Sequence, residues 1–287
     1  MTEKSLRERA QTLAEALPYL HKYQGRAVVV KYGGSVMLDA ELQASVLRDV
    51  VLLGYVGIST ILVHGGGPEI SEMMRRLGRE PKVVNGLRVT DEETMRIAQM
   101  VLVGRINQEI VSAINQQGGK AVGLSGKDGN LLIASKKEGP VDLGLVGQVE
   151  EVSTDILDTL VRAGYIPVVA PIAIGRQGET FNVNADHAAG RLAAAVKAAK
   201  LIVLSDVPGI LRDRSDESTL VSALTAAEAQ ALIDQGIIES GMLPKVQGCL
   251  EAIRSGVERC HLIDGRLPHA ILMELLTDAG IGTMITA

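Results

Sequence analysis

The sequence predicts an α/β fold built around an open, mainly parallel sheet. Short runs of β-branched and other apolar residues alternate along the chain with stretches of helical periodicity. These runs are continuously apolar, as in parallel strands that are covered by helices on both faces. The chain has 287 residues, of which 46% are hydrophobic, so it can bury a substantial core. At roughly 150 residues per domain, this length indicates about two domains or lobes.

Six segments are expected to form buried strands. They are Ala27–Tyr32, Thr60–His64, Ala121–Leu124, Ile166–Ala170, Leu201–Ser205 and Arg259–Ile263. Capping boxes of the form T-x-x-E predict helices that begin at Thr90 and Thr225. One excursion interrupts the alternation, because Leu131–Ala134 and Val146–Val149 flank a polar, glycine-containing segment at Lys136–Gly144. This pattern predicts a β-hairpin.

Residues 1–24 are predicted to form an amphipathic helix. Apolar residues recur at spacings of four, three, four and three, at Leu6, Ala10, Leu13, Leu17 and Leu20. Ser5 and Glu8 have the spacing of a capping box, and Pro18 should bend or end the helix. The apolar side can pack against its own domain or against another subunit, and both alternatives remain open.

Composition excludes several classes of function. There are 29 Lys and Arg residues against 34 Asp and Glu residues, which gives a net charge of −5 and argues against binding nucleic acid by bulk charge. With 2% aromatic residues and no Trp, a protein that stacks single-stranded bases is not expected. The sequence has no signal peptide and no apolar run of membrane-spanning length, so a cytoplasmic protein without a membrane partner is expected. Cys249 and Cys260 are interpreted as buried apolar residues, and no metal ligands are assigned.

Three glycine-rich turns follow predicted strands. They are Lys31-Tyr32-Gly33-Gly34-Ser35, His64-Gly65-Gly66-Gly67-Pro68 and Ser125-Gly126-Lys127-Asp128-Gly129. Ligands bind at the carboxyl ends of strands in open α/β sheets, where such turns present backbone N–H groups. The first two turns, each entering a helix, therefore favour an anion site over bare turns. Their spacing matches neither the P-loop nor G-x-G-x-x-G, and protein-kinase motifs are absent from the sequence.

Two lysines accompany these turns. Lys31 ends a strand beside the first glycine pair, where the alternative is a solvated surface lysine. Lys245 follows Gly241-Met242-Leu243-Pro244, so it should lie in the first turn of a helix that begins near Pro244. A cation is disfavoured at a helix N-terminus unless an anion binds there. Lys245 is therefore a candidate binding residue.

Polar side chains also gather in two short motifs. In Phe181–Asp186, Asn182, Asn184 and Asp186 occupy alternate positions and share a face if the segment is extended. The alternative is that Asp186 caps a helix over Ala188–Ala199. Asn85-Gly86-Leu87-Arg88 is a turn that delivers an arginine, a side chain suited to bidentate capture of a carboxylate.

Together these motifs resemble the amino acid kinase family over nearly the whole chain, from about Ala27 to Ile285. The resemblance is carried by Lys31-Tyr32-Gly33-Gly34, His64–Pro68, Asn85–Thr90, Asn182–Asp186, Ser205-Asp206-Val207-Pro208-Gly209-Ile210 and Gly241–Lys245. The second, third and fourth motifs point to the acetylglutamate branch of the family. The resemblance implies a three-layer α/β/α sandwich with two lobes. The N-terminal lobe, residues 25–190, would bind N-acetyl-L-glutamate and form a dimer, and the C-terminal lobe, residues 191–287, would bind ATP.

The implied reaction is phosphorylation of the γ-carboxylate of N-acetyl-L-glutamate by ATP, the second step of arginine biosynthesis. By resemblance the catalytic residues are Lys31, Lys245 and Asp186, where Asp186 orients the two lysines. The substrate-binding residues would be Gly66, Gly67, Arg88, Asn182 and Asn184. The nucleotide would contact Lys31, Gly33, Gly34, Asp206, Gly209, Ile210, Leu211, Gly241, Met242 and Lys245. Mg²⁺ is expected on ATP oxygens and water, without a protein ligand.

The resemblance extends to regulation and assembly. Arginine-inhibited members have an additional N-terminal helix that links dimers into a hexamer, a trimer of dimers, and a C-terminal stretch like Gly265–Thr283. Arginine inhibition is therefore expected, with contacts at His269, Glu274 and Gly282. Alternatively, Leu267–Leu276 is only an amphipathic helix. In oxygenic phototrophs such kinases bind the signalling protein PII, which would be a partner if the chain comes from such an organism.

Other activities remain as alternatives. Within the family these are carbamate kinase, aspartokinase, glutamate 5-kinase and uridylate kinase, although aspartokinase usually carries regulatory domains for which 287 residues leave no room. A non-catalytic sensor of ATP and an amino acid is a different class of function, but it would not need both lysines and Asp186. A nicotinamide dehydrogenase is disfavoured because its glycine fingerprint is missing.

Overall fold

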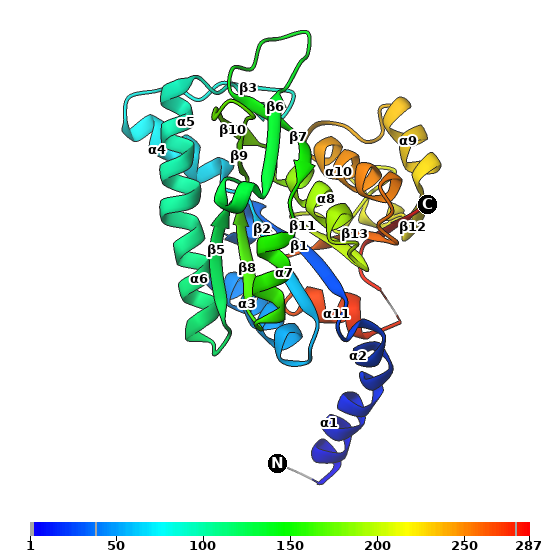
Figure 1. Cartoon of the computed structure of the whole chain (residues 1–287). Coiled ribbons are helices and arrows are strands. Elements are labelled where there is room, and N and C mark those ends of the chain that lie inside the picture. Colours follow the sequence, from blue (N-terminus) through cyan, green and yellow to red (C-terminus); the bar gives the residue numbers. More distant parts are fainter. Residues whose placement is uncertain (1–2, 38, 279) are drawn as a thin grey trace.

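A twisted eight-stranded sheet runs through the part of the chain that the computed structural model describes, which is residues 3–37, 39–278 and 280–287 (Figure 1). Across the sheet the strands are β12 (Ala223–Thr225), β14 (Thr283–Thr286), β13 (Cys260–Asp264), β11 (Lys200–Ser205), β1 (Ala27–Tyr32), β2 (Ser59–His64), β8 (Ile166–Ala170) and β5 (Ala121–Ser125). Only the β13–β14 pair among these described strands is antiparallel. The six predicted strands are all present, each within one residue of its expected bounds.

Helices cover both faces of this sheet, which makes the three-layer α/β/α fold that was expected. One layer contains α3 (Ala40–Tyr55), α4 (Gly67–Arg76), α5 (Glu92–Gln99), the π-helix η2 (Met100–Ile106), α6 (Asn107–Gln116) and α11 (Ala270–Leu276). The other contains α7 (Asp155–Arg162), α8 (Ala185–Ala195), α9 (Ala226–Asp234) and α10 (Leu243–Arg254). The described 3₁₀ helices are η1 (Gly34–Met37), η3 (Asp128–Asn130), η4 (Glu217–Thr219) and η5 (Ser240–Met242).

Alternate residues of β1 face the two layers. Val28, Val30 and Tyr32 belong to the core under α3, whereas Val29 belongs to the core under α8 and α10. Side chains alternate between the faces of a strand, so Lys31 lies on the same side as Val29. The alternation of side chains along β1 thus directs the lysine towards α8.

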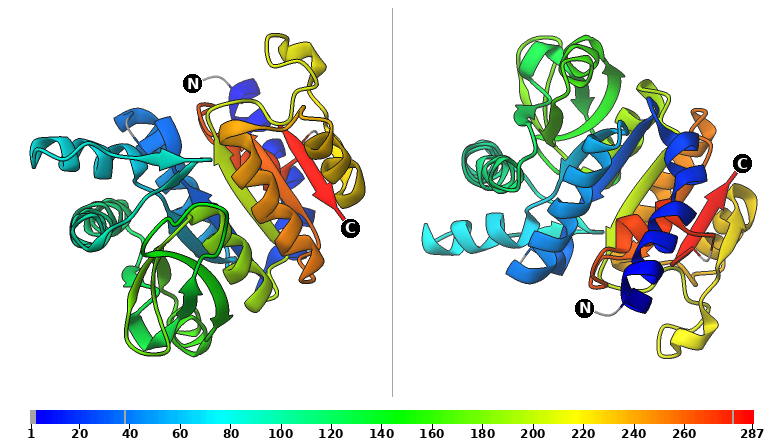
Figure 2. Two further views of the ribbon diagram at one scale, coloured as in Figure 1. Left: turned by 90° about the horizontal axis from the view of Figure 1, so that it is seen from above. Right: turned by 90° about the horizontal axis from the view of Figure 1, so that it is seen from below.

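A second, smaller body sits at the carboxyl ends of β5 and β8. The strands β6 (Leu132–Lys136), β7 (Val146–Val152), β9 (Ile172–Ile174) and β10 (Thr180–Val183) close into a barrel. Views from above and below show this green barrel beside the central strands (Figure 2). β6 and β7 are antiparallel and are joined by the polar loop, which confirms the predicted hairpin.

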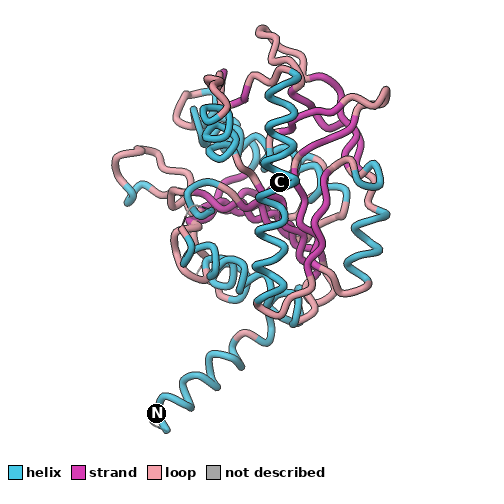
Figure 3. Tube along the Cα trace, turned by 90° about the vertical axis from the view of Figure 1, so that its left-hand side faces the viewer, coloured by secondary structure: helices cyan, strands magenta, loops and turns pink. Residues whose placement is uncertain are grey.

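The N-terminal segment forms two helices. α1 (Glu3–Glu15) projects away from the body, and α2 (Leu17–Tyr23) returns to it (Figures 1 and 3). The break at Ala16 confirms the predicted bend near Pro18. Leu13 and Leu17 are 75% and 65% exposed, so this part of the arm does not pack against its own domain. The expected cap at Ser5 is wrong, because α1 already includes Glu3.

The other two capping boxes have different outcomes. Thr225 and Glu228 form the predicted box at the start of α9. At α5 the box is wrong, because Asp91 is the cap and its side chain accepts a hydrogen bond from the Thr94 N–H at 2.7 Å. Thr90 instead pairs with Gly144 in a β-bridge. Thr90 is therefore extended and lies one residue before the cap, Asp91.

Two further expectations concern residues away from the site. Both cysteines are buried and free, which confirms their interpretation as core residues. Across residues 3–37, 39–278 and 280–287, no helix combines the length and apolar character needed to cross a bilayer. Position 190, the expected boundary between lobes, lies inside α8, and the division into two lobes stays a prediction.

Candidate active site

The first two glycine turns meet because β1 and β2 are neighbours. Tyr32 pairs with His64 in the parallel register, and the Gly65 N–H donates to the Tyr32 carbonyl at 2.8 Å. A Cβ atom placed on Gly33 would lie 3.0 Å from the Lys31 Nζ and 3.7 Å from the Gly65 nitrogen. The lysine ammonium therefore lies against the first turn, as the sequence predicted, and Gly33 of that turn lies beside Gly65 of the second.

Asp186 joins Lys31 from the opposite element. The Lys31 Nζ lies 3.1 Å from Asp186 Oδ1, and both side chains are 8% exposed. Asp186 is in the first turn of α8, whose cap is Asn184. The Asn184 side chain accepts hydrogen bonds from the Asp186 N–H at 2.9 Å and the His187 N–H at 3.1 Å. The alternative that Asp186 caps a helix over residues 188–199 is therefore wrong, and the extended segment ends at Val183.

Lys245 approaches the same point from α10, whose first turn contains Pro244 as predicted. Its Nζ donates to the Gly241 carbonyl at 3.0 Å. Burial lowers the pKa of Lys245, while the Asp186 carboxylate opposes the shift and the Lys31 charge adds to it. The two lysines thus lie within electrostatic reach of each other and of one carboxylate.

A first cavity, of about 450 Å³, opens between the second glycine turn, the β3–β4 hairpin and the start of α8. The hairpin strands are β3 (Val83–Val84) and β4 (Leu87–Arg88). The lining includes all five predicted substrate residues and Asp186. The remaining lining residues were not predicted from the sequence, among them Ile70, Ser71, Leu102, Val146 and Pro171.

Arg88 is the cation of this first cavity. The turn at Asn85 and Gly86, with φ of 50° and 78°, reverses the chain and brings Arg88 over α4. Its Nη2 donates to the Gly67 carbonyl at 2.7 Å and to Ser71 Oγ at 2.6 Å. Burial lowers the pKa of Arg88. No carboxylate of the described chain forms an ion pair with this half-buried guanidinium, which leaves it available to an anionic ligand.

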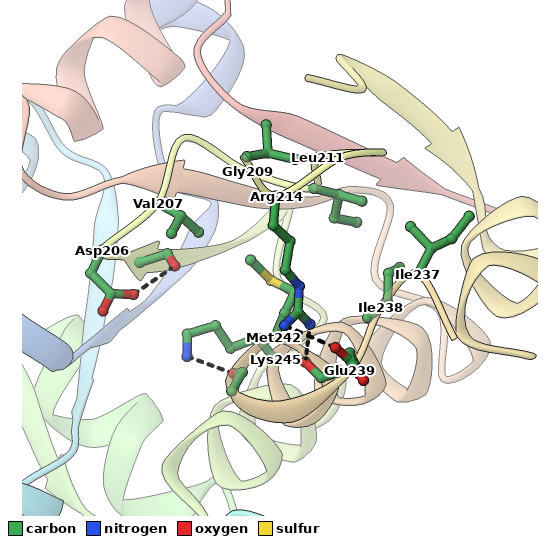
Figure 4. A pocket seen from close by; sticks show the side chains of 13 residues that line it. Asp206, Val207, Gly209, Leu211, Arg214, Ile237, Ile238, Glu239, Met242 and Lys245 are labelled. Carbon is green, nitrogen blue, oxygen red and sulfur yellow. Dashed lines mark hydrogen bonds and ion pairs between the residues drawn. The ribbon is translucent and has the colours of Figure 1, made fainter. Parts of the chain in front are cut away.

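A second cavity, of about 310 Å³, lies on the other side of the lysines (Figure 4). Seven of the predicted nucleotide residues line it, namely Asp206, Gly209, Ile210, Leu211, Gly241, Met242 and Lys245. Lys31, Gly33 and Gly34 are not in its lining and lie at the end of β1. In Figure 4, Asp206 and the Lys245 ammonium lie towards one side of the cavity, with Ile237 and Ile238 towards the other. Asp206 and Lys245 thus lie at one end of the cavity, and the isoleucines lie at the other beside the Arg214–Glu239 ion pair.

Several lining residues of the second cavity were missed from the sequence. Arg214 lies in the cavity and donates to the Glu239 carbonyl at 3.1 Å, while Ile237 and Ile238 supply apolar side chains. These residues come from loops around α9 that have no glycine signature. Only the folded chain brings them to the end of β11.

The residues expected to contact arginine lie outside the linings of both cavities. Glu274, on α11, is buried, and its Oε1 lies 3.0 Å from Lys200 Nζ and 2.6 Å from His261 Nδ1. Burial alone would raise the pKa of Glu274, but the His261 hydrogen bond and the Lys200 charge lower it to about 2. His269 lies 2.7 Å from Asp49 Oδ1 on α3. Gly282 has φ of 92° and abuts the Leu262 carbonyl.

Comparison with known proteins agrees with this architecture. The model of the amino acid kinase family matches residues 26–264. The acetylglutamate kinase of Pelotomaculum thermopropionicum is 54% identical over 97% of this chain and 98% of its own length. The acetylglutamate kinase of Symbiobacterium thermophilum is 53% identical, with 97% of both chains covered.

Solved structures show the same fold. An N-acetylglutamate synthase from Neisseria gonorrhoeae, complexed with coenzyme A and N-acetyl-glutamate, matches with a TM-score of 0.85 and 28% identity. The match covers 97% of this chain and 63% of the synthase chain. A carbamate kinase from Giardia lamblia bound to AMP-PNP has a TM-score of 0.65 at 17% identity, covering 91% of this chain and 98% of its own, which supports the fold alone. The chain belongs to the amino acid kinase family, among its acetylglutamate kinases.

Proposed function

We propose that the protein transfers the γ-phosphoryl group of ATP to the γ-carboxylate of N-acetyl-L-glutamate, the second step of arginine biosynthesis. One observation carries this proposal. The first cavity holds Arg88, which is half-buried and forms no ion pair with a described carboxylate. The second cavity has isoleucines at one end. Lys31, Asp186 and Lys245 lie where the two cavities approach each other. An acid in the first cavity and a nucleotide in the second would present their reacting groups to the same two ammonium groups.

The reaction needs no general base. A γ-carboxylate with a reference pKa near 4.3 is already ionised at neutral pH. Its oxygen attacks the γ-phosphorus, a new O–P bond forms, and the bond to the bridging oxygen of ADP breaks. Catalysis then consists of bringing two anions together and neutralising the charge on the transferring group. Lys31 and Lys245 supply that charge, and Asp186 holds Lys31 in place.

Backbone groups complete the phosphoryl site. We assign the N–H groups of Gly33, Gly34 and Gly66 as donors to the transferring oxygens. In the first cavity, Arg88 binds the α-carboxylate of the substrate, and Asn182 and Asn184 hydrogen-bond it from β10 and the α8 cap. Gly66 and Gly67 let the acyl group approach the backbone.

The nucleotide occupies the second cavity, where Ile210, Leu211 and Met242 contact the base and Asp206 and Gly209 lie at the ribose and phosphate end. Mg²⁺ supplies charge neutralisation on the ATP phosphates. Among the described residues, no group of three His, Cys, Asp or Glu side chains could hold a metal ion. We assign the ion no protein ligand, and it would be carried by ATP oxygens and water.

Assembly and regulation are part of the proposal. The exposed leucines of α1 and α2 suit an interface between dimers, and thus a hexamer. The buried acidic site at Glu274, together with His269 and Gly282, is where arginine would inhibit. A solved structure of the N-acetylglutamate synthase from Neisseria gonorrhoeae, complexed with coenzyme A and L-arginine, has a similar fold. PII stays a predicted partner for a chain from an oxygenic phototroph.

The experiment traps the acyl phosphate with hydroxylamine in the presence of ATP and Mg²⁺. N-acetyl-L-glutamate, L-glutamate, L-aspartate and carbamate are compared at equal concentration. Hydroxamate from N-acetyl-L-glutamate alone supports the assigned reaction and substrate. Hydroxamate from another acid alone would reassign the first cavity, and none from any acid would favour a ligand sensor on the same fold.

A further inference from the structure

A buried histidine and asparagine lie beneath the second glycine turn, outside the lining of both cavities. His64 is the last residue of β2, and its side chain is 0% exposed. Its Nδ1 lies 2.9 Å from the Gly65 carbonyl oxygen. Its Nε2 lies 3.1 Å from the side-chain nitrogen of Asn107, which is 1% exposed at the start of α6. The roles proposed above use neither side chain.

Backbone carbonyls fix the orientation of the Asn107 amide. Its Nδ2 lies 2.9 Å from the Val168 carbonyl and 3.4 Å from the Leu124 carbonyl. A flipped amide would oppose oxygen to oxygen at both carbonyls, so the NH₂ group must face them. One of its two hydrogens bonds the nearer Val168 carbonyl, and the other is directed at His64. The amide oxygen fills a space kept open by Gly123, where a Cβ atom would lie 1.9 Å from Asn107 Oδ1.

This orientation determines the tautomer of His64. Asn107 Nδ2 can only donate, so the His64 Nε2 must accept and carries no proton. In the neutral ring the proton is then on Nδ1, which donates to the Gly65 carbonyl. Burial lowers the pKa of His64 to about 4, so the ring is neutral at physiological pH. The asparagine thus selects the tautomer that holds Gly65.

The bond to Gly65 sets the direction of the next N–H group. The peptide between Gly65 and Gly66 is trans, because the described chain has no cis peptide bonds. In a trans peptide the N–H points opposite to the carbonyl. With the Gly65 carbonyl turned to the buried histidine, the Gly66 N–H points away from it, and Gly65 and Gly66 both line the first cavity.

Apolar side chains of the helical segment that precedes Asn107 pack against Gly66. A Cβ atom on Gly66 would lie 2.4 Å from Ile106 Cδ1 and 2.7 Å from Leu102 Cδ2. Both residues belong to the π-helix η2, which ends immediately before Asn107. The π-helix and the first residue of α6 therefore contact the turn at two adjacent points, one through Gly66 and the other through His64.

We propose that His64, held by Asn107 as the Nδ1–H tautomer, is a positioning residue that directs the Gly66 N–H at the transferring phosphoryl group. The inference rests on the proposed function, because Gly66 is assigned there as a phosphoryl donor. It adds a supporting layer of two residues that touch neither substrate nor nucleotide. Their effect should appear in turnover, since the N–H group contributes most when charge develops on the phosphoryl oxygens.

The kinetic test compares His64→Leu with His64→Asn. The Asn side-chain nitrogen can replace Nδ1 as a donor to Gly65, whereas Leu cannot. A displaced donor can cost about 100-fold in rate, so kcat of His64→Leu should fall by about that factor while KM for ATP stays unchanged. His64→Asn should keep kcat within about fivefold of the parent, because the donor is retained.

A matched pair on α6 separates positioning from stability. Asn107→Ala should lower kcat in the same way as His64→Leu. Asn115→Ala is the control, because the Asn115 side chain also bonds a backbone group, the Ala121 N–H at 2.7 Å, without contact to His64. It should lower the unfolding free energy and leave kcat unchanged. Equal kcat in folded His64→Leu and the parent enzyme would overturn the inference.

A measurement on the unaltered protein reads the tautomer directly. Long-range ¹H–¹⁵N spectra at about pH 7 report which imidazole nitrogen carries the proton. The expected signature for His64, assigned by its absence from His64→Asn, is a protonated Nδ1 and a bare Nε2. A protonated Nε2 would overturn the inference even if the enzyme is active. If the parent forms no acyl phosphate, the proposed function fails, and the spectra alone then decide the tautomer.

Discussion

Lys31 Nζ and Asp186 Oδ1 are 3.1 Å apart in an environment where both side chains are 8% exposed. The residues come from β1 and α8, elements separated by more than half of the chain. Burying such a pair costs desolvation energy that the mutual attraction only partly offsets, so the pair is weak evidence for a stabilising role. Its position between two cavities, with Lys245 nearby, indicates that the pair is kept for binding and chemistry.

Lys245→Ala should reduce kcat by about 100- to 1000-fold, the range seen when one group that stabilises developing charge is removed. KM for N-acetyl-L-glutamate should change little, because Lys245 lines the second cavity, where we propose that ATP binds, and not the first. Steady-state kinetics at saturating ATP measures both constants. Arg254→Ala, at an exposed position on the same helix, is the control. Near-full turnover by Lys245→Ala would remove this lysine from the mechanism.

Asp186→Asn should destabilise the fold as well as lower activity. Removing one partner of a buried ion pair leaves the other charge uncompensated, which costs about 3–5 kcal/mol. Urea unfolding measures this loss. In the double variant Lys31→Met with Asp186→Asn, stability should recover while turnover stays low, because the charges needed for catalysis are gone. A single variant as stable as the parent would show that Lys31 does not need this carboxylate.

Arg88→Ala should chiefly raise KM for the carboxylate substrate. Hydrogen bonds to charged groups contribute about 1.5–3 kcal/mol, which corresponds to about 10- to 100-fold in binding. The loss should fall on the acid and not on ATP, because Arg88 lines only the first cavity among the two described here. Arg76→Ala on α4 is a surface control, with its guanidinium paired to Glu72. A change confined to KM for ATP would contradict the assignment of the cavities.

The buried His64 should make stability depend on pH. Burial lowers its pKa from 6.5 to about 4. Between these values the unfolded chain takes up a proton that the folded chain does not, so the unfolding free energy falls as pH falls from 6.5 towards 4, by up to about 3 kcal/mol. Urea unfolding at several pH values should show a steeper decline for the parent than for His64→Asn. Parallel curves would mean that folding does not lower the pKa of His64.

If the protein forms the proposed hexamer, removing residues 1–16 should convert it to a dimer without unfolding the chain. Leu6 and Leu13, which the cut removes, are 49% and 75% exposed, which suits contact with another subunit. The cut precedes Tyr23, which is buried in the body. Light scattering after size exclusion gives the mass. Leu13→Glu is a milder change that should weaken the same contact. An unchanged number of subunits in both proteins would place the interface elsewhere.

Much of this fold could be predicted from the sequence because the signals are local. Continuous apolar runs such as Ala27–Tyr32 identify buried strands, and the glycine turns identify the sheet edge where ligands bind. The edge strand β12 and its neighbour β14 were missed, since both are short and lack a continuous apolar run. The cap of α8 was misplaced because Asn184 and Asp186 are both good caps, and packing of α8 against β1 selects between them.

The parts of the site that were missed depend on tertiary contacts. Arg214 and Ile237 reach the second cavity only when the loops around α9 fold over the end of β11. The π-helix has no sequence signature, yet it brings Leu102 into the first cavity and Asn107 against His64. Such residues can be recognised only once the folded chain is known.

The most direct test of the central claim follows an oxygen atom. N-acetyl-L-glutamate labelled with ¹⁸O at both oxygens of its γ-carboxylate is incubated with the enzyme, ATP and Mg²⁺, and the product is trapped with hydroxylamine. Hydroxylamine attacks the acyl carbon, so the bridging oxygen leaves with phosphate. If the carboxylate attacks the γ-phosphorus directly, each phosphate released should carry one ¹⁸O atom. Unlabelled phosphate would show that water attacks ATP instead, and would contradict the transfer between the two cavities.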